Sequence, residues 1–168
     1  FELLRRLGRF YMDADNYRDG LRTLRQAATH FRTHEKAAEV TQEMSDVFAY
    51  LYLEDGADVM APVTAIALYD EFKELTPAGE LGDKMIRNLA DRLVAVDLLE
   101  NGAEILEAQV KFRLEGVEKA RVGARLAFIR IMNLDFDEAL DALLETQTDG
   151  LPEELVTQRR HFMARAMM

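Results

Sequence analysis

Two histidines four residues apart are the first candidates for chemistry in this sequence. At this spacing His30 and His34 would share one face of a helix and could bind a metal ion together. A turn is expected between them, however, and no carboxylate or third histidine is placed to complete the ligand set. His161 stands beside two arginines and is typical of a surface position. The pattern favours ordinary histidines, and we expect no metal site.

The motifs of the common enzyme classes are missing from the sequence. It has no cysteine, which excludes thiolate catalysis, disulfides and cysteine-bound metal. No nucleophile has a base nearby in sequence, and there is neither a phosphate-cradling glycine loop nor an HExxH box. We therefore expect a protein that is not an enzyme and that binds no cofactor.

Charge is distributed unevenly along the 168 residues, whose net charge is −10. Residues 1–36 hold eight Lys and Arg against five Asp and Glu, whereas residues 37–116 hold six against seventeen. The acidic middle argues against binding of nucleic acids or anionic membranes, because it repels phosphate. No apolar run approaches the roughly twenty residues that span a bilayer, so we expect no membrane insertion.

The basic N-terminal region contains a stripe of arginines at helical spacing. Its members are Arg18, Arg22, Arg25 and Arg32. The stripe could meet an acidic partner or the acidic middle of another copy. A solvated helix face is the interpretation that we favour, because surface charges usually face water.

The elements that carry these residues are expected to be helices. The chain is rich in Ala, Leu, Glu, Arg and Met, and only three prolines and nine glycines interrupt it. Apolar residues recur at spacings of three and four, and no strand pattern competes. Helices are expected at about residues 3–11, 17–31, 35–53, 59–75, 80–96, 98–114, 118–132, 136–146 and 153–168. Asp15, Asp97 and Asp135 are expected to cap the helices that follow them.

One pattern of large and small residues recurs three times at matching intervals. A large residue followed by a small one in the first helix of a pair is seen in Leu7-Gly8, Leu89-Ala90 and Leu126-Ala127. The second helix then opens with Tyr17, Leu99 or Phe136, and a small residue follows at Gly20, Gly102 or Ala139. Small residues allow two helices to cross closely, and large ones fill the space on either side.

The recurring pattern resembles the tetratricopeptide repeat, whose motif includes a Leu-Gly pair, a Tyr three residues later and a small residue in the second helix. Leu7-Gly8 and Tyr11 in the first copy match it best. The usual Trp is replaced by Leu4, Ile86 and Gly123, and a fourth, degenerate copy covers residues 35–77. We interpret these as divergent, bacterial-type repeats.

The resemblance implies a right-handed α-solenoid of about four antiparallel hairpins with a terminal unpaired helix, all in one tetratricopeptide-like domain. The repeats are expected at about residues 1–34, 35–78, 80–116 and 117–151, with a further one beginning at 152–168. We expect the chain to be part of a longer protein, whose exposed repeat ends could drive self-association. A closed helical bundle that acts as an enzyme or regulatory domain is the alternative.

The resemblance also implies a concave groove that is lined by the first helices and binds a peptide or helix of a partner protein. The side chains expected there are Arg5, Arg9, Lys84, Arg87, Asn88, Arg121, Arg125 and Phe128. Among them Asn88, Arg121 and Arg125 are similar to residues with which relatives clamp a peptide carboxylate. Solvent-facing residues that balance neighbouring acids are the interpretation that we favour for these three.

The expected function is therefore that of a protein–protein interaction scaffold, and it follows from the fold alone. Nothing in the sequence identifies the partner, the pathway or the oligomeric state. The compartment is taken as cytoplasmic by default, and a periplasmic location would follow if a signal or anchor preceded these residues.

Overall fold

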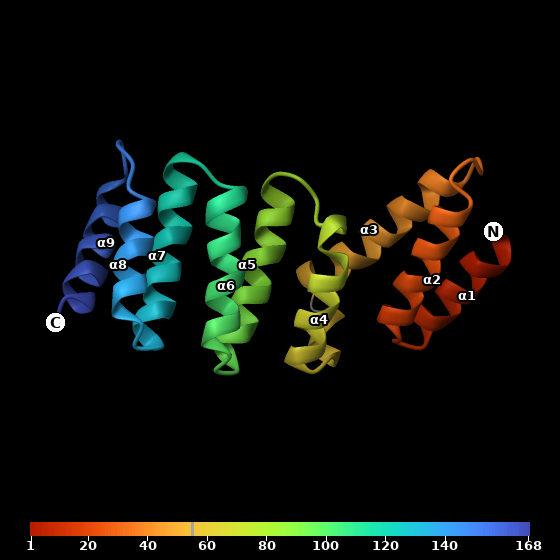
Figure 1. Cartoon of the computed structure of the whole chain (residues 1–168), viewed down its shortest axis with the longest axis horizontal. Coiled ribbons are helices and arrows are strands. Elements are labelled where there is room, and N and C mark those ends of the chain that lie inside the picture. The colour runs from red at the N-terminus through yellow and green to blue at the C-terminus, as the bar shows by residue number, and fades with distance from the viewer. Residues whose placement is uncertain (55) are drawn as a thin grey trace. The chain divides into compact units, whose positions relative to one another are not determined.

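The computed structural model describes residues 1–54 and 56–168, and every regular element within them is a helix (Figure 1). These residues form nine α-helices and two short 3-10 helices, which confirms the all-helical prediction. The chain divides into two compact units, Phe1–Pro77 and Ala78–Met168. The division falls between the helices expected at residues 59–75 and 80–96, where Pro77 and Gly79 separate one helical run from the next.

The first unit is built from two successive pairs of α-helices. Its elements are α1 (Glu2–Asp13), α2 (Tyr17–His30), α3 (Ala37–Leu53), η1 (Gly56–Val59), α4 (Pro62–Phe72) and η2 (Lys73–Leu75). α1 packs on α2, and α2 packs on α3. The fully buried side chains include Leu21 and Leu24 of α2 and Phe48 of α3. The predicted fourth helix is correct in position, but after Phe72 it tightens into the 3-10 helix η2.

The second unit continues with five α-helices that pack in chain order. They are α5 (Glu80–Ala95), α6 (Leu99–Phe112), α7 (Gly116–Met132), α8 (Phe136–Glu145) and α9 (Glu153–Ala166). Each of α5 to α8 packs on the next helix, and α9 packs on both α7 and α8. Met85, Leu93 and Ile129 are fully buried in this core. The terminal helix is thus held against its own unit.

Three turns share one backbone geometry, although they lie in different parts of the chain. They join α1 to α2, α5 to α6 and α7 to α8. Each contains one non-glycine residue in the left-handed region, with φ of 57° at Asp15, 64° at Asp97 and 67° at Leu134. The next N–H donates over 2.8–2.9 Å to the carbonyl five positions back, in the pairs Asn16–Tyr11, Leu98–Leu93 and Asp135–Arg130.

This geometry corrects two of the predicted helix caps. Asp15 and Asp97 do not cap a helix but occupy the left-handed turn position, which Asp tolerates better than most residues. The N-cap positions are Asn16 and Leu98, and the Asn16 side chain accepts a bond from the Asp19 N–H at 3.4 Å. Asp135 does occupy the N-cap of α8, but its side chain makes no capping bond.

The small residues of the sequence pattern lie where paired helices cross closely. A Cβ atom added to Gly20 in α2 would come 3.0 Å from the Gly8 carbonyl oxygen in α1. A Cβ atom added to Gly102 in α6 would come 3.3 Å from the Ala90 carbonyl oxygen in α5. Both distances are too short for a side chain to be accepted without a shift. The physical reason given for the pattern therefore applies to both hairpins.

The α3–α4 pair is filled by aromatic rings instead of being crossed at glycine. The ring centroids of Phe48 and Tyr52 lie 4.9 Å apart, and both rings contact Tyr69 of α4 at 5.8–6.0 Å. The Tyr52 hydroxyl donates to the Ala65 carbonyl over 2.8 Å, so this buried polar atom is satisfied. The degenerate sequence copy thus corresponds to a differently packed hairpin.

Candidate functional site

A hollow of about 710 Å³ lies between α1 and α3 in the first unit, and we call it the α1–α3 groove. Its walls consist of side chains from these two helices. The lining residues are Arg5, Arg9, Met12 and Asp13 of α1, and Glu39, Gln42, Glu43, Asp46 and Val47 of α3. Two of them, Arg5 and Arg9, belong to the groove set predicted from the sequence.

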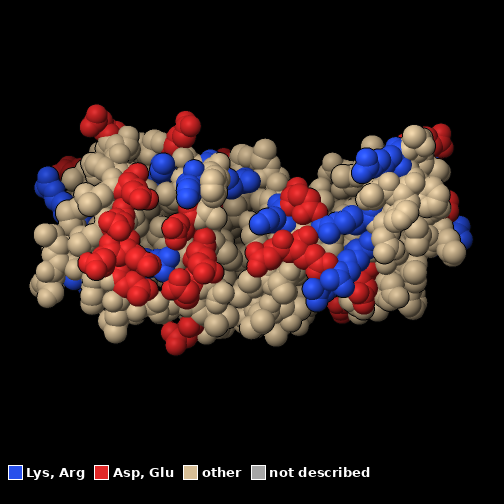
Figure 2. All heavy atoms as spheres, viewed as in Figure 1, with Lys and Arg blue, Asp and Glu red and all other residues tan. Residues whose placement is uncertain are grey.

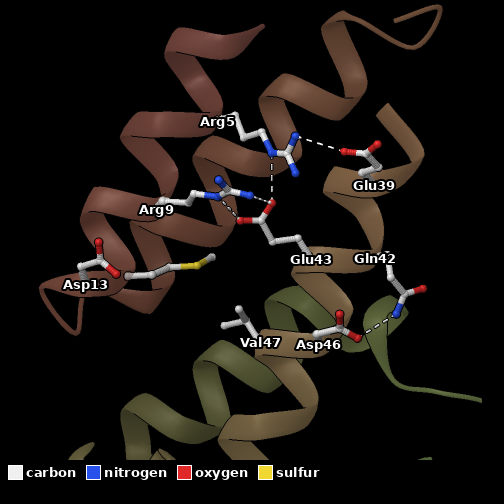
Figure 3. A pocket seen from close by; sticks show the side chains of 9 residues that line it. Arg5, Arg9, Asp13, Glu39, Gln42, Glu43, Asp46 and Val47 are labelled. Carbon is white, nitrogen blue, oxygen red and sulfur yellow. Dashed lines mark hydrogen bonds and ion pairs between the residues drawn. The ribbon is translucent and has the colours of Figure 1, made fainter. Parts of the chain in front are cut away.

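One end of the groove is closed by a network of ion pairs (Figure 3). Glu43 accepts bonds from the Arg5 Nε at 3.2 Å and from the Arg9 Nη2 at 3.0 Å. Arg5 also donates from Nη1 to Glu39 at 3.3 Å. Burial raises the pKa of Glu43, but hydrogen bonds from Arg9 and Arg5 outweigh burial and hold that pKa below its ordinary value. Both guanidiniums at this end are therefore engaged by carboxylates of the same chain.

Away from these ion pairs the groove is lined by the apolar side chains of Met12 and Val47. Figure 3 shows Asp13 of α1 and Asp46 of α3 on opposite sides of this part, with Val47 between them, and Asp13 is attracted to Arg9 on its own helix. Asp46 accepts a bond from the Gln42 amide over 2.8 Å, and within the described residues neither aspartate forms an ion pair. Met12 is half-buried and packs over Gly20, whose missing side chain makes room for it. The complete groove contains four carboxylates and two guanidiniums.

The other predicted groove residues belong to the second unit and form separate contacts. Arg125 donates to Asp91 over 2.8 Å, and its guanidinium lies 5.8 Å from the ring centroid of Phe128. Arg121 pairs with Glu118 on its own helix at 3.2 Å. The structure thus brings Arg125 and Phe128 together on α7, and the predicted clamp residues Arg121 and Arg125 each have an acidic neighbour.

Three further predicted residues lie on α5, at Lys84, Arg87 and Asn88. Lys84 is exposed, and Asn88 is half-buried. Arg87 lines a hollow of about 380 Å³ together with Glu80, Asp83, Leu114 and Glu118. That hollow is bordered mainly by carboxylates, so it has the same sign of charge as the α1–α3 groove.

Sequence reasoning missed the acidic side of the α1–α3 groove. One signal for it was present, because Arg5 and Glu39, and likewise Arg9 and Glu43, are 34 residues apart. Arg125 of α7 bonds Asp91 of α5 at the same separation of 34. Opposite charges 34 residues apart thus connect α1 with α3 and α5 with α7.

The arginine stripe of α2 is bound by α4 of the same unit. Arg18 donates to Glu71 over 2.7 Å, and Arg22 bonds the same carboxylate. Arg25 lies 4.1 Å above the Phe72 ring and donates to the Glu71 carbonyl at 2.7 Å. Figure 2 shows basic and acidic side chains side by side in the region of α2 and α4. Arg18 and Arg22 are still about half exposed, as the interpretation of a solvated face predicts, but the acidic middle of the same chain also pairs with them.

In the second unit, carboxylates gather over α6 and α8 (Figure 2). They surround the Arg130 side chain, which is only 7% exposed. Its ion-pair partners are Glu100 at 2.9 Å, Glu107 at 3.1 Å, Glu138 at 2.8 Å and Asp135 at 3.8 Å. Arg130 thus forms the centre of this acidic surface.

The two histidines that suggested a metal site are placed separately. α2 ends at His30, whose Nδ1 lies 3.0 Å from the Gln26 carbonyl oxygen. His34 lies in the following turn and accepts a bond from the Lys36 N–H at 3.2 Å. Among the residues that the structure describes, no group of three or more metal-ligating side chains is arranged to hold an ion. In the same residues no helix combines the length and apolarity needed to cross a membrane.

Comparison with known proteins found no match, since no protein-family model, curated protein or solved structure is significantly similar to this chain.

Proposed function

We propose that this chain is a tetratricopeptide-like repeat protein that binds a peptide or helix of a partner protein along its first helices. The observation that carries the proposal is the α1–α3 groove. Its volume of about 710 Å³ is large enough to take several side chains of a peptide. Apolar and charged residues line it together, as is typical of surfaces that recognise a protein segment.

The repeated architecture supports the proposal. Gly8, Ala90 and Ala127 hold the same position relative to three turns of one geometry, and α1, α5 and α7 are therefore equivalent first helices. Helical hairpins that repeat in this way stack into an α-solenoid, for which we propose the right-handed form. In such a stack the first helices form a continuous surface on which an extended partner can lie.

The charged groups of the molecule favour a binding role over catalysis. Ion-pair and hydrogen-bond partners displace the pKa values of several charged groups toward the ionised form, against the effect of burial. These groups are Arg9, Arg22, Glu43, Glu71 and Arg130. Each of these partners is a charged side chain of the scaffold, and the pairs join one helix to another. We therefore assign the perturbed groups to stabilisation of the repeats and propose no reaction.

The proposal is tested by blocking the groove with a bulky side chain. Val47→Trp on α3 places an indole in the groove, whereas Val63→Trp adds the same group to an exposed position of α4. We expect a partner captured by the wild-type protein to be lost with the first variant and kept with the second. A partner that binds both variants equally, or no partner at all, would contradict the proposal. Circular dichroism verifies that both variants fold.

The residues predicted in the second unit need a separate variant. Arg121→Glu with Arg125→Glu reverses two charges on α7 and removes the bond to Asp91. Loss of the same partner would extend the binding surface to α7, and retention would confine it to the first unit. Small-angle scattering tests the solenoid itself, because a curved rod is expected and a compact sphere would favour the closed bundle.

A further inference from the structure

We infer that α1 carries a second binding surface, on which an amphipathic helix of a partner protein with carboxylates at its edge docks. The surface consists of Leu3, Leu7 and Phe10, which are 80%, 40% and 67% exposed, and we call it the α1 apolar face. Spacings of four and three residues place these side chains on one side of the helix. Other side chains of α1 line the α1–α3 groove, so this surface does not depend on the function proposed for the groove.

The equivalent positions of α7 are buried. Leu7 and Leu126 each lie eight residues before the left-handed residue of the next turn, so α1 and α7 can be compared position by position. The three residues of the α1 apolar face then correspond to Val122, Leu126 and Ile129, none of which is more than 4% exposed. The same apolar positions are therefore covered by a neighbour in α7 and open in α1.

The neighbours of α1 and α7 differ by one helix. α7 packs on α6, α8 and α9. The counterparts of α8 and α9 are α2 and α3, and α1 contacts both, since it packs on α2 and is joined to α3 by the ion pairs of the groove. No described helix of the first unit takes the place of α6, and Figure 1 shows α1 at an edge of that unit. Because α2 also packs on α3 as α6 packs on α7, the occupant that fits the α1 apolar face is a helix with an apolar side.

The edge of the α1 apolar face is basic. Arg6 lies within the span of the three apolar residues, is exposed, and forms no ion pair among the described residues. In the contact between α6 and α7 the covering helix supplies the acids, since Glu100 and Glu107 of α6 pair with Arg130 of α7. A carboxylate at the edge of the docked helix would pair with Arg6 in a similar way.

A second copy of the chain fits the α1 apolar face less well than a partner helix. A two-fold contact centred on this face would bring the two Arg6 side chains together, because Arg6 lies midway between Leu3 and Phe10. A head-to-tail contact would place the face against α9, whose exposed side chains are polar or charged except for Ala164. Both symmetric and head-to-tail contacts therefore lack a complementary surface.

The test uses a fluorescent helical peptide of Ala, Leu and Glu whose leucines share one side, and a scrambled peptide of the same composition whose leucines do not. Fluorescence anisotropy measures binding. We expect the amphipathic peptide to bind the wild-type chain, and Leu3→Gln with Phe10→Gln to weaken that binding about tenfold, because apolar surface is lost while helix propensity is kept. The control, Val63→Gln with Leu144→Gln, changes similarly exposed apolar residues elsewhere and should alter the affinity less than about twofold. Circular dichroism verifies that the variants fold.

The contribution of charge is measured separately. Arg6→Gln should weaken binding of the Glu peptide about threefold and leave a matched peptide with Gln in place of Glu unaffected. An equal effect of Arg6→Gln on both peptides would exclude the acidic edge of the docked helix.

The remaining outcomes distinguish this surface from the groove. Val47→Trp, which fills the α1–α3 groove, should leave binding of the amphipathic peptide unchanged. Equal binding of the scrambled peptide, or unchanged affinity of the Leu3/Phe10 variant, would overturn the inference, and loss of binding in Val47→Trp would place the peptide in the groove instead. Self-association of the chain that disappears in the Leu3/Phe10 variant would assign the face to a second copy and also overturn it. In each of these cases the function proposed for the groove stands or falls by its own test.

Discussion

The two units use opposite arrangements of charge to join their helices. In the first unit one carboxylate serves two guanidiniums, since Glu43 binds Arg5 and Arg9, and Glu71 binds Arg18 and Arg22. In the second unit one guanidinium, that of Arg130, serves four carboxylates. The central group is largely buried in each cluster, with 19% of the Glu43 and Glu71 side chains exposed and 7% of Arg130, although Arg5 at 14% is less exposed than Glu43. The less exposed the central group, the more opposite charges surround it.

The pKa values of the central groups follow from these surroundings. Hydrogen bonds from Arg22 and Arg18 hold the pKa of Glu71 below its ordinary value, although burial opposes them. Burial lowers the pKa of Arg130, but its bonds and attraction to Glu100 and its attraction to Glu138 outweigh burial and raise it. In both units the partners thus favour the ionised form of the central group. Charge itself, and not merely hydrogen bonding, stabilises these contacts.

Arg159 of α9 is a buried arginine of a third kind, because its hydrogen-bond acceptors are neutral groups instead of carboxylates. It donates to the carbonyl oxygens of Ala120 at 2.6 Å and Leu143 at 2.5 Å, and to the Thr146 hydroxyl at 3.1 Å. Burial lowers the pKa of Arg159, yet the guanidinium stays protonated because the ordinary pKa of an arginine lies far above neutral pH. Because neutral acceptors bind this charge, the contribution of Arg159 to stability should depend on salt differently from that of Arg130.

The largest effect is expected for Arg159→Met. The variant keeps an apolar stem of similar length but removes the donors for three buried acceptors, and we expect the free energy of unfolding to fall by about 3 kcal/mol. Because the acceptors are neutral, the loss should be the same at low and high salt. Amide hydrogen exchange of α7, α8 and α9 measures this loss of stability. Arg160→Met, at the exposed neighbouring position, is the control. Equal effects of the two variants would refute a special role for Arg159.

The helices themselves could be predicted closely from the sequence. The fifth helix was expected at residues 80–96 and lies at Glu80–Ala95, because Pro77 and Gly79 mark its start and apolar spacing marks its length. The caps could not be predicted, since an aspartate before a helix is equally suited to the N-cap and to a left-handed turn. Asp15 and Asp97 take the second role because the chain must turn sharply there.

The second largest effect is expected for Arg130→Met. Four carboxylates that attract Arg130 would then repel one another, and the free energy of unfolding should fall by about 2 kcal/mol at low salt. Added salt screens both the attraction and the repulsion, so the difference between variant and wild type should shrink. Urea unfolding at two salt concentrations measures this. Arg121→Met, which removes an exposed arginine with a single partner on its own helix, should cost far less.

A smaller effect, with a distinct pH dependence, is expected in the first unit for Glu71→Gln. The variant leaves Arg18 and Arg22 without their shared carboxylate and should lower the free energy of unfolding by about 1 kcal/mol near neutral pH. The pKa of Glu71 in the folded chain lies below its ordinary 4.5, so the pairs stabilise the wild type above that pH. Their contribution is lost as the pH falls below 4.5 through the folded-state pKa.

The pH profile distinguishes this pair network from nonspecific charge loss. Wild type and Glu71→Gln should converge in stability in acid, whereas Asp70→Asn, at the neighbouring exposed position, should follow the wild-type curve. A constant difference between wild type and Glu71→Gln across the acid range would contradict the assignment. Unfolding monitored from pH 7 downward provides the comparison.

The pairing of charges was the part of the site that the sequence could not reveal. The stripe Arg18, Arg22 and Arg25 is visible in the sequence, but its partner Glu71 is 53 residues from Arg18 and resembles every other acid of the region. Ion pairs between helices depend on which helices become neighbours, and only the fold determines this. Only the basic residues Arg5 and Arg9 of the α1–α3 groove were therefore among the predicted groove residues, whereas its acidic side comes from α3.

The smallest effect is expected for Asp13→Asn, and its sign separates function from stability. Removing a carboxylate from the C-terminal end of α1 should raise the free energy of unfolding by about 0.5 kcal/mol, because the helix dipole repels that charge. Asp19→Asn is the matched control, since Asp19 lies in the first turn of α2 and accepts a bond from Asn16 at 2.9 Å. The same loss of charge should destabilise the chain there. A stabilised Asp13→Asn variant would show that this carboxylate is kept at a cost in stability, whereas a destabilised one would assign Asp13 to the fold through its attraction to Arg9.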